Sequence, residues 1–235
     1  MNSRQPDEPI TIHGIDFDAV YQGRPLMAGL SNDRLPWDIG QAQPAVRELE
    51  ASGRLHGEIL DIGCGLGDNA IFLAERGHHV TALDGSATAI DQARARARDA
   101  AVEVDFGVAD ATELTGYEDR FDTVLDSALY HCLNDEQRLT YAAALHRVTT
   151  PRALLNIMCI RDGLPAPVPA ATGVSQENLR NTLGATGWTI TSLRPGHYLG
   201  APAAGELAAT LGLDADTNPD GHVAIPMWIV EAHRA

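Results

Sequence analysis

Residues 59–77 read ILDIGCGLGDNAIFLAERG, and this stretch decides the fold. An apolar run of strand type comes first, glycines follow at positions 63, 65 and 67, and an apolar pattern with helical spacing comes last. Glycine lets a backbone turn sharply and lets a ligand approach it closely. The stretch therefore predicts a strand, a turn that contacts a ligand, and a helix in direct succession.

Downstream of this stretch, apolar β-rich runs alternate with helical patterns, which is typical of βαβ units around a parallel sheet. Helix-capping signals stand at Ser86, at Asn134 with Gln137, and at Ser175. We therefore predict an α/β fold with a doubly wound, Rossmann-like sheet of seven mostly parallel strands, the last of them antiparallel. The predicted strands are residues 58–63, 79–84, 102–110, 121–127, 153–160, 188–196 and 222–232.

Residues 1–40 do not follow this alternation; they hold scattered aromatic residues and prolines and are predicted to form an N-terminal helical lid. Residues 41–235 form the main domain in this interpretation. Two tracts rich in proline and glycine, 162–173 and 196–221, are predicted loops, and such folds bind ligands at loops that follow parallel strands. The strand around Trp228 is predicted to be an exposed edge, and the sequence leaves the oligomeric state open.

The charge balance excludes several classes of partner. The formal net charge is −15, from 32 acidic and 17 basic residues. Proteins that bind nucleic acids or anionic membranes need a basic face, so we predict neither kind of partner. Arg94, Arg96 and Arg98 alternate along a predicted helix and are interpreted as a solvated face.

Three cysteines, at positions 64, 132 and 159, show no spacing typical of a zinc site or a redox dithiol. We therefore predict reduced thiols and no metal. The N-terminal residues lack the apolar core of a signal peptide, and no apolar run approaches membrane length. These features predict a cytoplasmic protein.

The glycine turn fits neither of the common phosphate-binding patterns. A dinucleotide fingerprint needs a third glycine where this chain has Asp68, and a P-loop needs a lysine followed by serine or threonine, which is absent. Asp61, at the end of the first strand, would repel a pyrophosphate in a partly desolvated cleft. A carboxylate there favours a cation instead, such as an ammonium or a sulfonium.

Two further aspartates indicate what the rest of the ligand is. Asp84 ends the second predicted strand, from which a carboxylate accepts hydrogen bonds from ribose hydroxyls. Asp110 ends the third predicted strand and is placed to accept from an adenine amino group. Ribose, adenine and a cationic amino-acid tail together describe S-adenosylmethionine.

Four segments carry a family resemblance. LDIGCGLG (60–67), VTALDGS (80–86), GVADATEL (107–114) and FDTVLDSALYHCL (121–133) resemble, in order and spacing, motifs I to IV of the class I S-adenosylmethionine-dependent methyltransferases. The resemblance makes residues 41–235 a methyltransferase domain. It implies S-adenosyl-L-methionine as the cofactor, bound by Trp37, Asp61, Gly63, Cys64, Gly65, Gly67, Asp84, Gly85, Asp110, Ala111, Asp126 and Ser127.

The end of the fourth predicted strand offers the candidate catalytic groups Asp126, Tyr130 and His131. A histidine can take a proton from a phenol or an N-hydroxyl group near neutral pH. The alternative is that His131 packs at the start of a helix and orients the backbone. His197 and Tyr198, predicted to lie in the loop after the sixth strand, are a second pair that should face the same cleft.

The N-terminal segment LPWDIGQAQPAV (35–46) resembles small-molecule methyltransferases of the thiopurine and halide/thiol type, and actinobacterial enzymes that methylate heterocyclic toxins. By this resemblance Trp37 lies against the cofactor or stacks on a flat substrate. The alternative is a tryptophan that anchors the N-terminal helix to the core. The predicted substrate residues are Tyr21, Met27, Trp37, His131, His197 and Tyr198.

These features predict methyl transfer to an oxygen or nitrogen of a small, flat, hydroxylated heteroaromatic compound such as a quinolone or quinol. A thiol, thiopurine or halide methyltransferase is one alternative, and a non-catalytic protein that binds S-adenosylmethionine is another. A nicotinamide-dependent reductase conflicts with Asp61 and Asp68.

Overall fold

The computed structural model describes residues 14–26, 35–164, 173–210 and 216–235. A seven-stranded sheet forms its centre, in the order β3-β2-β1-β4-β5-β7-β6. All neighbours pair in parallel except β7, which is antiparallel to both β5 and β6. The predicted fold class is confirmed. The strands are β1 (Glu58–Ile62), β2 (His79–Asp84), β3 (Asp105–Val108), β4 (Phe121–Ser127), β5 (Thr149–Ile160), β6 (Trp188–Gly200) and β7 (Val223–Arg234).

The helices begin where the capping signals predict. The Ser86 and Ser175 side chains accept hydrogen bonds from backbone amides three residues on, and Asn134 forms a capping box with Gln137. The helices are α1 (Phe17–Tyr21), α2 (Pro44–Ala51), α3 (Asp68–Ala74), α4 (Ala87–Asp99), α5 (Asp135–Val148), α6 (Gln176–Ala185) and α7 (Pro202–Thr210), with a 3-10 turn η2 (Tyr130–Cys132).

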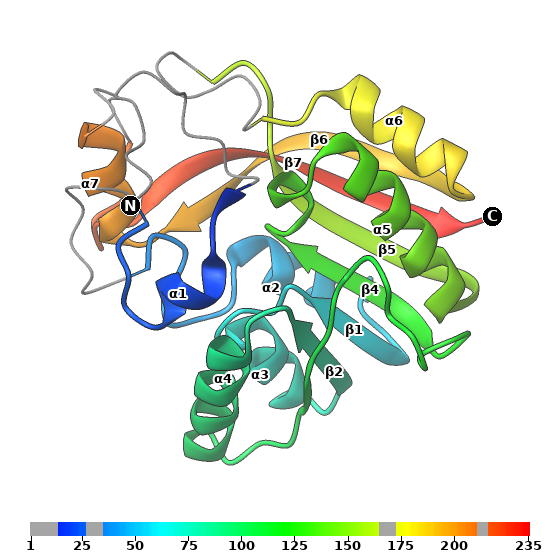
Figure 1. The fold of residues 1–235 in the computed structure, drawn as a ribbon, viewed down its shortest axis with the longest axis horizontal. Helices are drawn as coiled ribbons and strands as arrows, with labels where there is room; N and C mark the ends of the chain where they lie inside the picture. The colour runs from blue at the N-terminus through cyan, green and yellow to red at the C-terminus, as the bar shows by residue number, and fades with distance from the viewer. Residues whose placement is uncertain (1–13, 27–34, 165–172, 211–215) are drawn as a thin grey trace, which may run out of the picture.

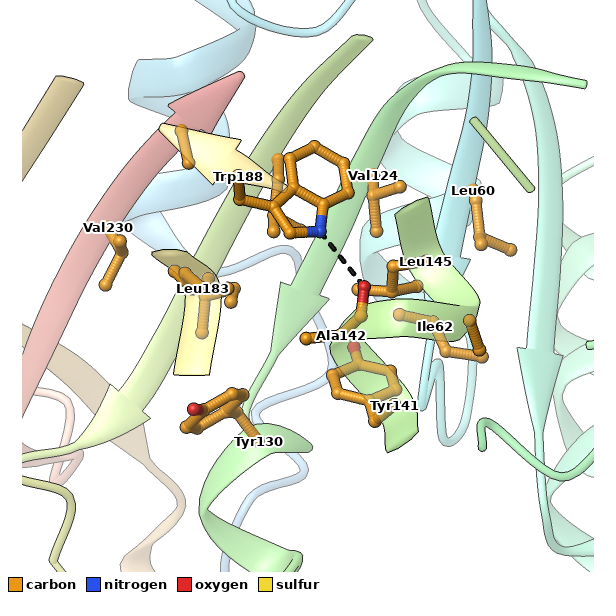
Figure 2. Close-up of a cluster of buried hydrophobic side chains, with 14 of the residues drawn as sticks. Leu60, Ile62, Val124, Tyr130, Tyr141, Ala142, Leu145, Leu183, Trp188 and Val230 are labelled. Carbon is orange, nitrogen blue, oxygen red and sulfur yellow. Dashed lines mark hydrogen bonds between the residues drawn. The ribbon is translucent and has the colours of Figure 1, made fainter. Parts of the chain in front are cut away.

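Side chains of each central strand alternate between two apolar layers. Leu60 and Val124 face a layer closed by α5 and α6, whereas Ile59 and Leu125 face a layer closed by α2, α3 and α4. Figure 2 shows the first layer, in which the buried Trp188 indole N–H donates a 3.0 Å hydrogen bond to the carbonyl of Ala142. This contact satisfies the one polar atom that the tryptophan brings into the core.

The predicted end of the sixth strand was wrong. Pro195 and Gly196 suggest a turn, yet β6 continues through them to Gly200, and α7 follows inside the predicted loop. Proline is tolerated because β6 is an edge strand. Gly196 packs closely against Ile229, since a Cβ at position 196 would lie 2.4 Å from Cδ1 of Ile229 and would displace that side chain. His197 and Tyr198 therefore belong to a strand.

The prediction of an exposed edge at Trp228 was also wrong. The last strand, β7, lies between β5 and β6, so that Val230 pairs with Ile157 on one side and Leu193 on the other. Trp228 is buried, and its indole N–H donates to the carbonyl of Val174. The edges of the sheet are β3 and β6.

Helices α1 and α7 lie near the end of the sheet toward which the arrow of β4 points, at the left of Figure 1. The side chain of Asp18 in α1 accepts hydrogen bonds from the Ser86 hydroxyl (2.6 Å) and the Thr88 amide (3.1 Å) at the start of α4. The described part of the predicted lid is thus joined to the start of α4, at the end of the sheet where the parallel strands finish. Within the described residues, no helix is both long and apolar enough to cross a membrane.

Candidate active site

The glycine turn joins β1 to α3 in a left-handed backbone conformation. The φ angles of Gly63, Gly65 and Gly67 are 71°, 53° and 84°. A Cβ at Gly67 would lie 2.9 Å from the Phe106 ring, and one at Gly65 would lie 2.8 Å from the Tyr21 hydroxyl. The turn therefore needs glycine both for its conformation and for the close approach of other groups.

Asp84, at the end of β2, holds the turn in place. Its Oδ2 accepts a 2.8 Å hydrogen bond from the Gly65 amide, and its Oδ1 accepts one of 2.8 Å from the Ser86 amide. Burial raises the pKa of Asp84, although these two amides favour its charged form. Each carboxylate oxygen has a second lone pair, so Asp84 can still accept from a ligand hydroxyl.

Asp61, at the end of β1, is 1% exposed, and neither of its carboxylate oxygens has a partner with good hydrogen-bond geometry among the described residues. The Ala70 backbone amide lies near enough to favour the charged form, but it does not outweigh burial. Burial raises the pKa of Asp61 to about 8, and the charges of Asp126 and Asp84 add to the effect. A buried carboxylate in this position is costly when charged. A bound cation would supply the missing partner.

Asp110 lies two residues beyond the end of β3, because that strand is shorter than predicted. Its Oδ1 accepts hydrogen bonds from the Thr112 amide (2.8 Å) and the Thr112 hydroxyl (2.7 Å), and the residue is exposed. The strands β1, β2 and β3 are neighbours and run in parallel, so their carboxyl ends lie side by side. Asp61, Asp84 and Asp110 therefore follow one another along these strand ends.

Asp126 has a structural role in the turn after β4, and its position does not support the predicted catalytic role. Its Oδ1 accepts hydrogen bonds from the amides of Leu129 (2.8 Å) and Tyr130 (3.3 Å), and its Oδ2 accepts one of 2.8 Å from the Tyr141 hydroxyl. The residue is fully buried, and burial raises its pKa to about 7. Both carboxylate oxygens of Asp126 are thus used in hydrogen bonds that hold the turn after β4 and the side chain of Tyr141 in place.

Tyr130 is likewise a core residue, and its position does not support the predicted catalytic role. Figure 2 shows its ring among the buried side chains of the first layer. Its hydroxyl donates a 3.2 Å hydrogen bond to Oδ1 of Asn178 in α6, and burial raises the pKa of Tyr130 to about 12. The phenol therefore stabilises the packing of η2 against α6.

His131 is the middle residue of η2, beside the end of β5. His131 is 5% exposed, and the Ile160 amide donates a 3.4 Å hydrogen bond to Nδ1 of its imidazole. Both its predicted catalytic role and its predicted packing role are compatible with this position.

His197 and Tyr198 cannot both face the site, because successive side chains of a strand point to opposite faces. His197 is exposed and points to the opposite face of β6 from Tyr198, so its predicted role as a substrate residue stays a prediction. Tyr198 is buried beside Ser127 and within electrostatic reach of Asp61, and burial raises the pKa of its phenol. Tyr198 therefore lies at the cofactor end of the site.

Aromatic side chains from the N-terminal segment cover the glycine turn. The Trp37 indole N–H donates a 3.2 Å hydrogen bond to the Tyr21 hydroxyl, and Trp37 makes edge contacts with the rings of Phe17 and Tyr21. Since the Tyr21 hydroxyl lies beside Gly65, this cluster adjoins the predicted cofactor site. Met27, the remaining predicted substrate residue, lies outside the described residues.

Comparisons with known proteins identify the family. A model of the methyltransferase domain matches residues 59–152. The chain is 33% identical to the 2-heptyl-1-hydroxyquinolin-4(1H)-one methyltransferase of Mycobacteroides abscessus over 204 residues, which cover 86% of this chain and 89% of that relative. The chain belongs to the class I S-adenosylmethionine-dependent methyltransferases. Its cofactor is S-adenosylmethionine.

Two solved structures extend the comparison. One comes from work on the conversion of a disulfide bond into a thioacetal group during echinomycin biosynthesis; it is 36% identical, with a TM-score of 0.79 over 93% of this chain and 91% of that chain. The magnesium protoporphyrin IX methyltransferase of Synechocystis PCC 6803, solved with bound S-adenosylmethionine, is 22% identical, with a TM-score of 0.56 over 81% of this chain and 76% of that chain. The second likeness concerns the fold alone.

The residues of this methyltransferase suit the cofactor. The unpaired carboxylate of Asp61 matches an ammonium group, and the left-handed glycine turn leaves no side chain between the backbone and a ligand. Cys64 and Gly63 donate their amides to the carbonyl of Leu83, which fixes the turn against β2. These observations agree with the predicted cofactor roles of Asp61 and the glycine turn.

Sequence reasoning missed the role of Arg96. Its guanidinium donates to the carboxylates of Asp38 (2.7 and 3.0 Å) and Asp68 (2.9 Å) and thereby ties the Trp37–Asp38 segment to α3 and α4. Burial alone would raise the pKa of Asp38, but Arg96 outweighs it and holds that pKa below its usual value. The predicted solvated face is wrong for this arginine, whose side chain is 33% exposed.

Gln43 is a second residue that the sequence did not single out. Its side-chain amide pairs with the backbone of Leu199, accepting from the amide and donating to the carbonyl at 2.9 Å each. The Ala201 amide also donates to the carbonyl of Pro36. The segment before α2 is thus attached to the end of β6, next to Tyr198.

Replacing Arg96 with methionine is expected to lower the free energy of unfolding by about 1–2 kcal/mol, because two partly buried carboxylates lose their shared cation. Urea denaturation measures this loss. Arg98→Met, on the exposed part of the same helix, is the matched control and should change stability by less than about 0.5 kcal/mol. Equal effects of the two substitutions would contradict the proposed bridging role.

Proposed function

We propose that this methyltransferase transfers a methyl group from S-adenosylmethionine to an oxygen of a small hydroxylated heteroaromatic compound of the hydroxyquinolinone type. The likeness to the M. abscessus hydroxyquinolinone methyltransferase, which covers most of both chains, carries the proposal. The acidic surface and net charge of −15 agree with an acceptor that is not a nucleic acid.

We assign the cofactor to the row of aspartates at the ends of β1, β2 and β3. Asp61 pairs with the amino-acid ammonium, Asp84 accepts from the ribose hydroxyls, and Asp110 accepts from the adenine amino group. The remaining cofactor contacts in the proposal are Trp37, Gly63, Cys64, Gly65, Gly67, Gly85, Ala111 and Ser127. Asp126 acts on the site only through the turn that it holds.

The bound cofactor supplies an electrophilic methyl group on a sulfonium. The protein orients the acceptor against it and excludes water, and positioning alone accounts for a large part of such a rate enhancement. Trp37 and Tyr21 cover the turn from the N-terminal side. No group of the site has to form a covalent bond to the substrate.

A sulfur acceptor is the second candidate. The solved structure from work on the conversion of a disulfide bond into a thioacetal group is 36% identical over 93% of this chain. Of two relatives of comparable identity, one is named for a hydroxyquinolinone and the other comes from work on a disulfide and a thioacetal, so this chain could use an oxygen or a sulfur nucleophile. The fold accommodates both, so the acceptor has to be measured.

A methylation assay tests the proposal directly. The purified protein is incubated with S-adenosylmethionine and single acceptors: hydroxyquinolinones, quinols, thiopurines, thiols, a cyclic disulfide peptide and iodide. We expect a methylated hydroxyquinolinone by mass spectrometry, together with release of S-adenosylhomocysteine. Asp61→Asn protein, which should bind the cofactor much more weakly, is the control at a cofactor concentration that saturates only the unmodified protein. Turnover of only the sulfur compounds would replace the oxygen proposal with the second candidate, and cofactor binding without any turnover would favour the non-catalytic alternative.

A further inference from the structure

Polar side chains from β1, β4 and β6 lie on one face of the sheet, at the end where the parallel strands finish. Ile59 and Leu125 pack into the layer closed by α2, α3 and α4. Asp61 and Ser127 each follow two residues later, so their side chains point to that same face. Tyr198 of β6 belongs to the same layer. Its phenol lies beside the Ser127 hydroxyl and close enough to Asp61 to be affected by its charge.

The Ser127 hydroxyl is buried without a good partner. Ser127 and Tyr198 are each 8% exposed, and Oγ of Ser127 has no partner with good hydrogen-bond geometry among the described residues. A hydroxyl group that is removed from water and poorly paired costs free energy. Two such groups side by side, next to a carboxylate that lacks a good partner as well, indicate a place where a polar part of a ligand completes the hydrogen bonds.

The Tyr198 phenol is held in its direction by the strand on which it stands. Gln43 accepts a hydrogen bond from the Leu199 amide and donates one to the Leu199 carbonyl, at 2.9 Å each, while β7 pairs with β6 on the other side. The Gln43 side chain also lies beside the Tyr198 hydroxyl. The phenol is therefore placed before any ligand binds, which lowers the entropy that binding costs.

The amino-acid tail of S-adenosylmethionine carries an ammonium and a carboxylate on the same carbon atom. If Asp61 binds the ammonium, the ligand carboxylate must bind next to Asp61. Asp84 and Asp126 lie close enough to Asp61 to affect its charge, so these surroundings repel a further anion. Arg96 is not available to offset this repulsion, because it already binds two other carboxylates. The ligand carboxylate therefore needs hydrogen-bond donors.

We propose that the hydroxyls of Ser127 and Tyr198 donate hydrogen bonds to the carboxylate of the S-adenosylmethionine tail. The proposal rests on the pairing of Asp61 with the ammonium in the proposed function, and it assigns Tyr198 to the cofactor instead of the acceptor. Hydrogen bonds to a carboxylate are about twice as strong as those between neutral groups. Neutral donors also suit this place, because an arginine there would pair with Asp61 and compete with the ligand.

Decarboxylated S-adenosylmethionine tests the proposal on the unmodified protein. This analogue keeps the adenine, ribose, sulfonium and ammonium and lacks only the carboxylate. Isothermal titration calorimetry should show that S-adenosylmethionine binds about 10–100-fold more tightly than the analogue, because the two hydroxyls bind a charged group. A site with three aspartates and no donors would repel the carboxylate and prefer the analogue. Equal or tighter binding of the analogue would overturn the proposal.

Two variants assign the effect to the hydroxyls. Tyr198→Phe keeps the buried ring, and Ser127→Ala keeps the Cβ. Each should weaken S-adenosylmethionine binding by about 10–100-fold and change binding of the analogue by less than about threefold. Tyr117→Phe is the matched control and should change neither, since that ring stacks on Phe121 at the opposite end of β4. A folded Tyr198→Phe protein that loses both ligands equally, or neither, would overturn the proposal. If one variant does not fold, the other variant and the unmodified protein decide.

Asp61→Asn separates this proposal from the proposed function. No acceptor is present in these titrations, so the identity of the acceptor does not affect them. The substitution should weaken both ligands alike, because both keep the ammonium. If it weakens neither, the assignment of Asp61 fails, whereas a selective loss of S-adenosylmethionine binding in Tyr198→Phe still places the carboxylate at the phenol.

Discussion

Asp61→Asn is expected to weaken S-adenosylmethionine binding by about 100–1,000-fold while raising the stability of the ligand-free protein above neutral pH. The affinity falls because the ammonium of the ligand loses its buried carboxylate, and breaking such a pair costs about 3–5 kcal/mol. Stability rises because the carboxylate has no partner with good hydrogen-bond geometry among the described residues. Isothermal titration calorimetry and urea denaturation measure the two effects.

The direction of the pKa shift of Asp61 determines how stability changes with pH. The pKa of Asp61 is raised from an ordinary value of 3.8 to about 8 in the folded protein. Between these values the folded state keeps a proton that the unfolded state loses, so the stabilising contribution is complete at low pH and is lost as the pH rises toward about 8. The loss is on the order of 6 kcal/mol, at about 1.4 kcal/mol per pKa unit. The asparagine variant should lack this part of the slope, although Asp126 keeps its own.

Ligand binding should show the opposite trend. A cation binds the ionised carboxylate, so the affinity of the unmodified protein for S-adenosylmethionine should increase with pH up to about 8, by up to tenfold per unit, whereas that of the variant should stay flat. Asp99→Asn, at an exposed position of α4, is the control and should alter neither slope. A pH-independent affinity in the unmodified protein would contradict the pairing of Asp61 with the ammonium.

Asp126→Ala is expected to destabilise the protein by about 3–5 kcal/mol, the second large effect. The substitution leaves the amides of Leu129 and Tyr130 and the hydroxyl of Tyr141 without their shared acceptor in a fully buried place. Each unsatisfied buried group costs about 1–3 kcal/mol, and some of the turn can relax. Thermal and urea denaturation measure the loss.

Asp126→Asn separates the structural role from a catalytic one. Asparagine keeps an oxygen that can accept from the two amides, so we expect a loss of only about 1–2 kcal/mol. The neutral side chain also removes a charge that raises the pKa of Asp61, so cofactor binding near neutral pH should not weaken. Tyr141→Phe, which removes one of the three hydrogen bonds, should resemble it in stability. A folded Asp126→Asn protein that binds the cofactor but is inactive would restore the catalytic role.

The sequence predicted the parts of the site that lie within one strand and the turn after it. Asp61, Asp84 and the three glycines are positioned by local patterns, namely the end of an apolar strand and a left-handed turn. The order of the strands follows from the same patterns, because right-handed crossovers permit few arrangements of βαβ units.

What the sequence did not show depends on contacts between distant segments. Arg96 and Asp38 are 58 residues apart, and Gln43 and Leu199 are 156 apart, so no local spacing reveals either pair. The error at His197 has a different cause. Pro195 and Gly196 have the composition of a turn, but here they mark an edge strand and a close contact with Ile229. Composition alone does not distinguish these meanings.

The place of β7 in the sheet has a consequence for synthesis on the ribosome. Among the described strands, β6 pairs only with β7, and β7 separates it from β5. A nascent chain that has reached residue 200 thus holds the whole of β6 with no strand beside it, and the apolar edge of β5 is open as well. Only emergence of residues 223–234 can close this half of the sheet. Until then, the growing chain should depend on chaperones that shield unpaired strands.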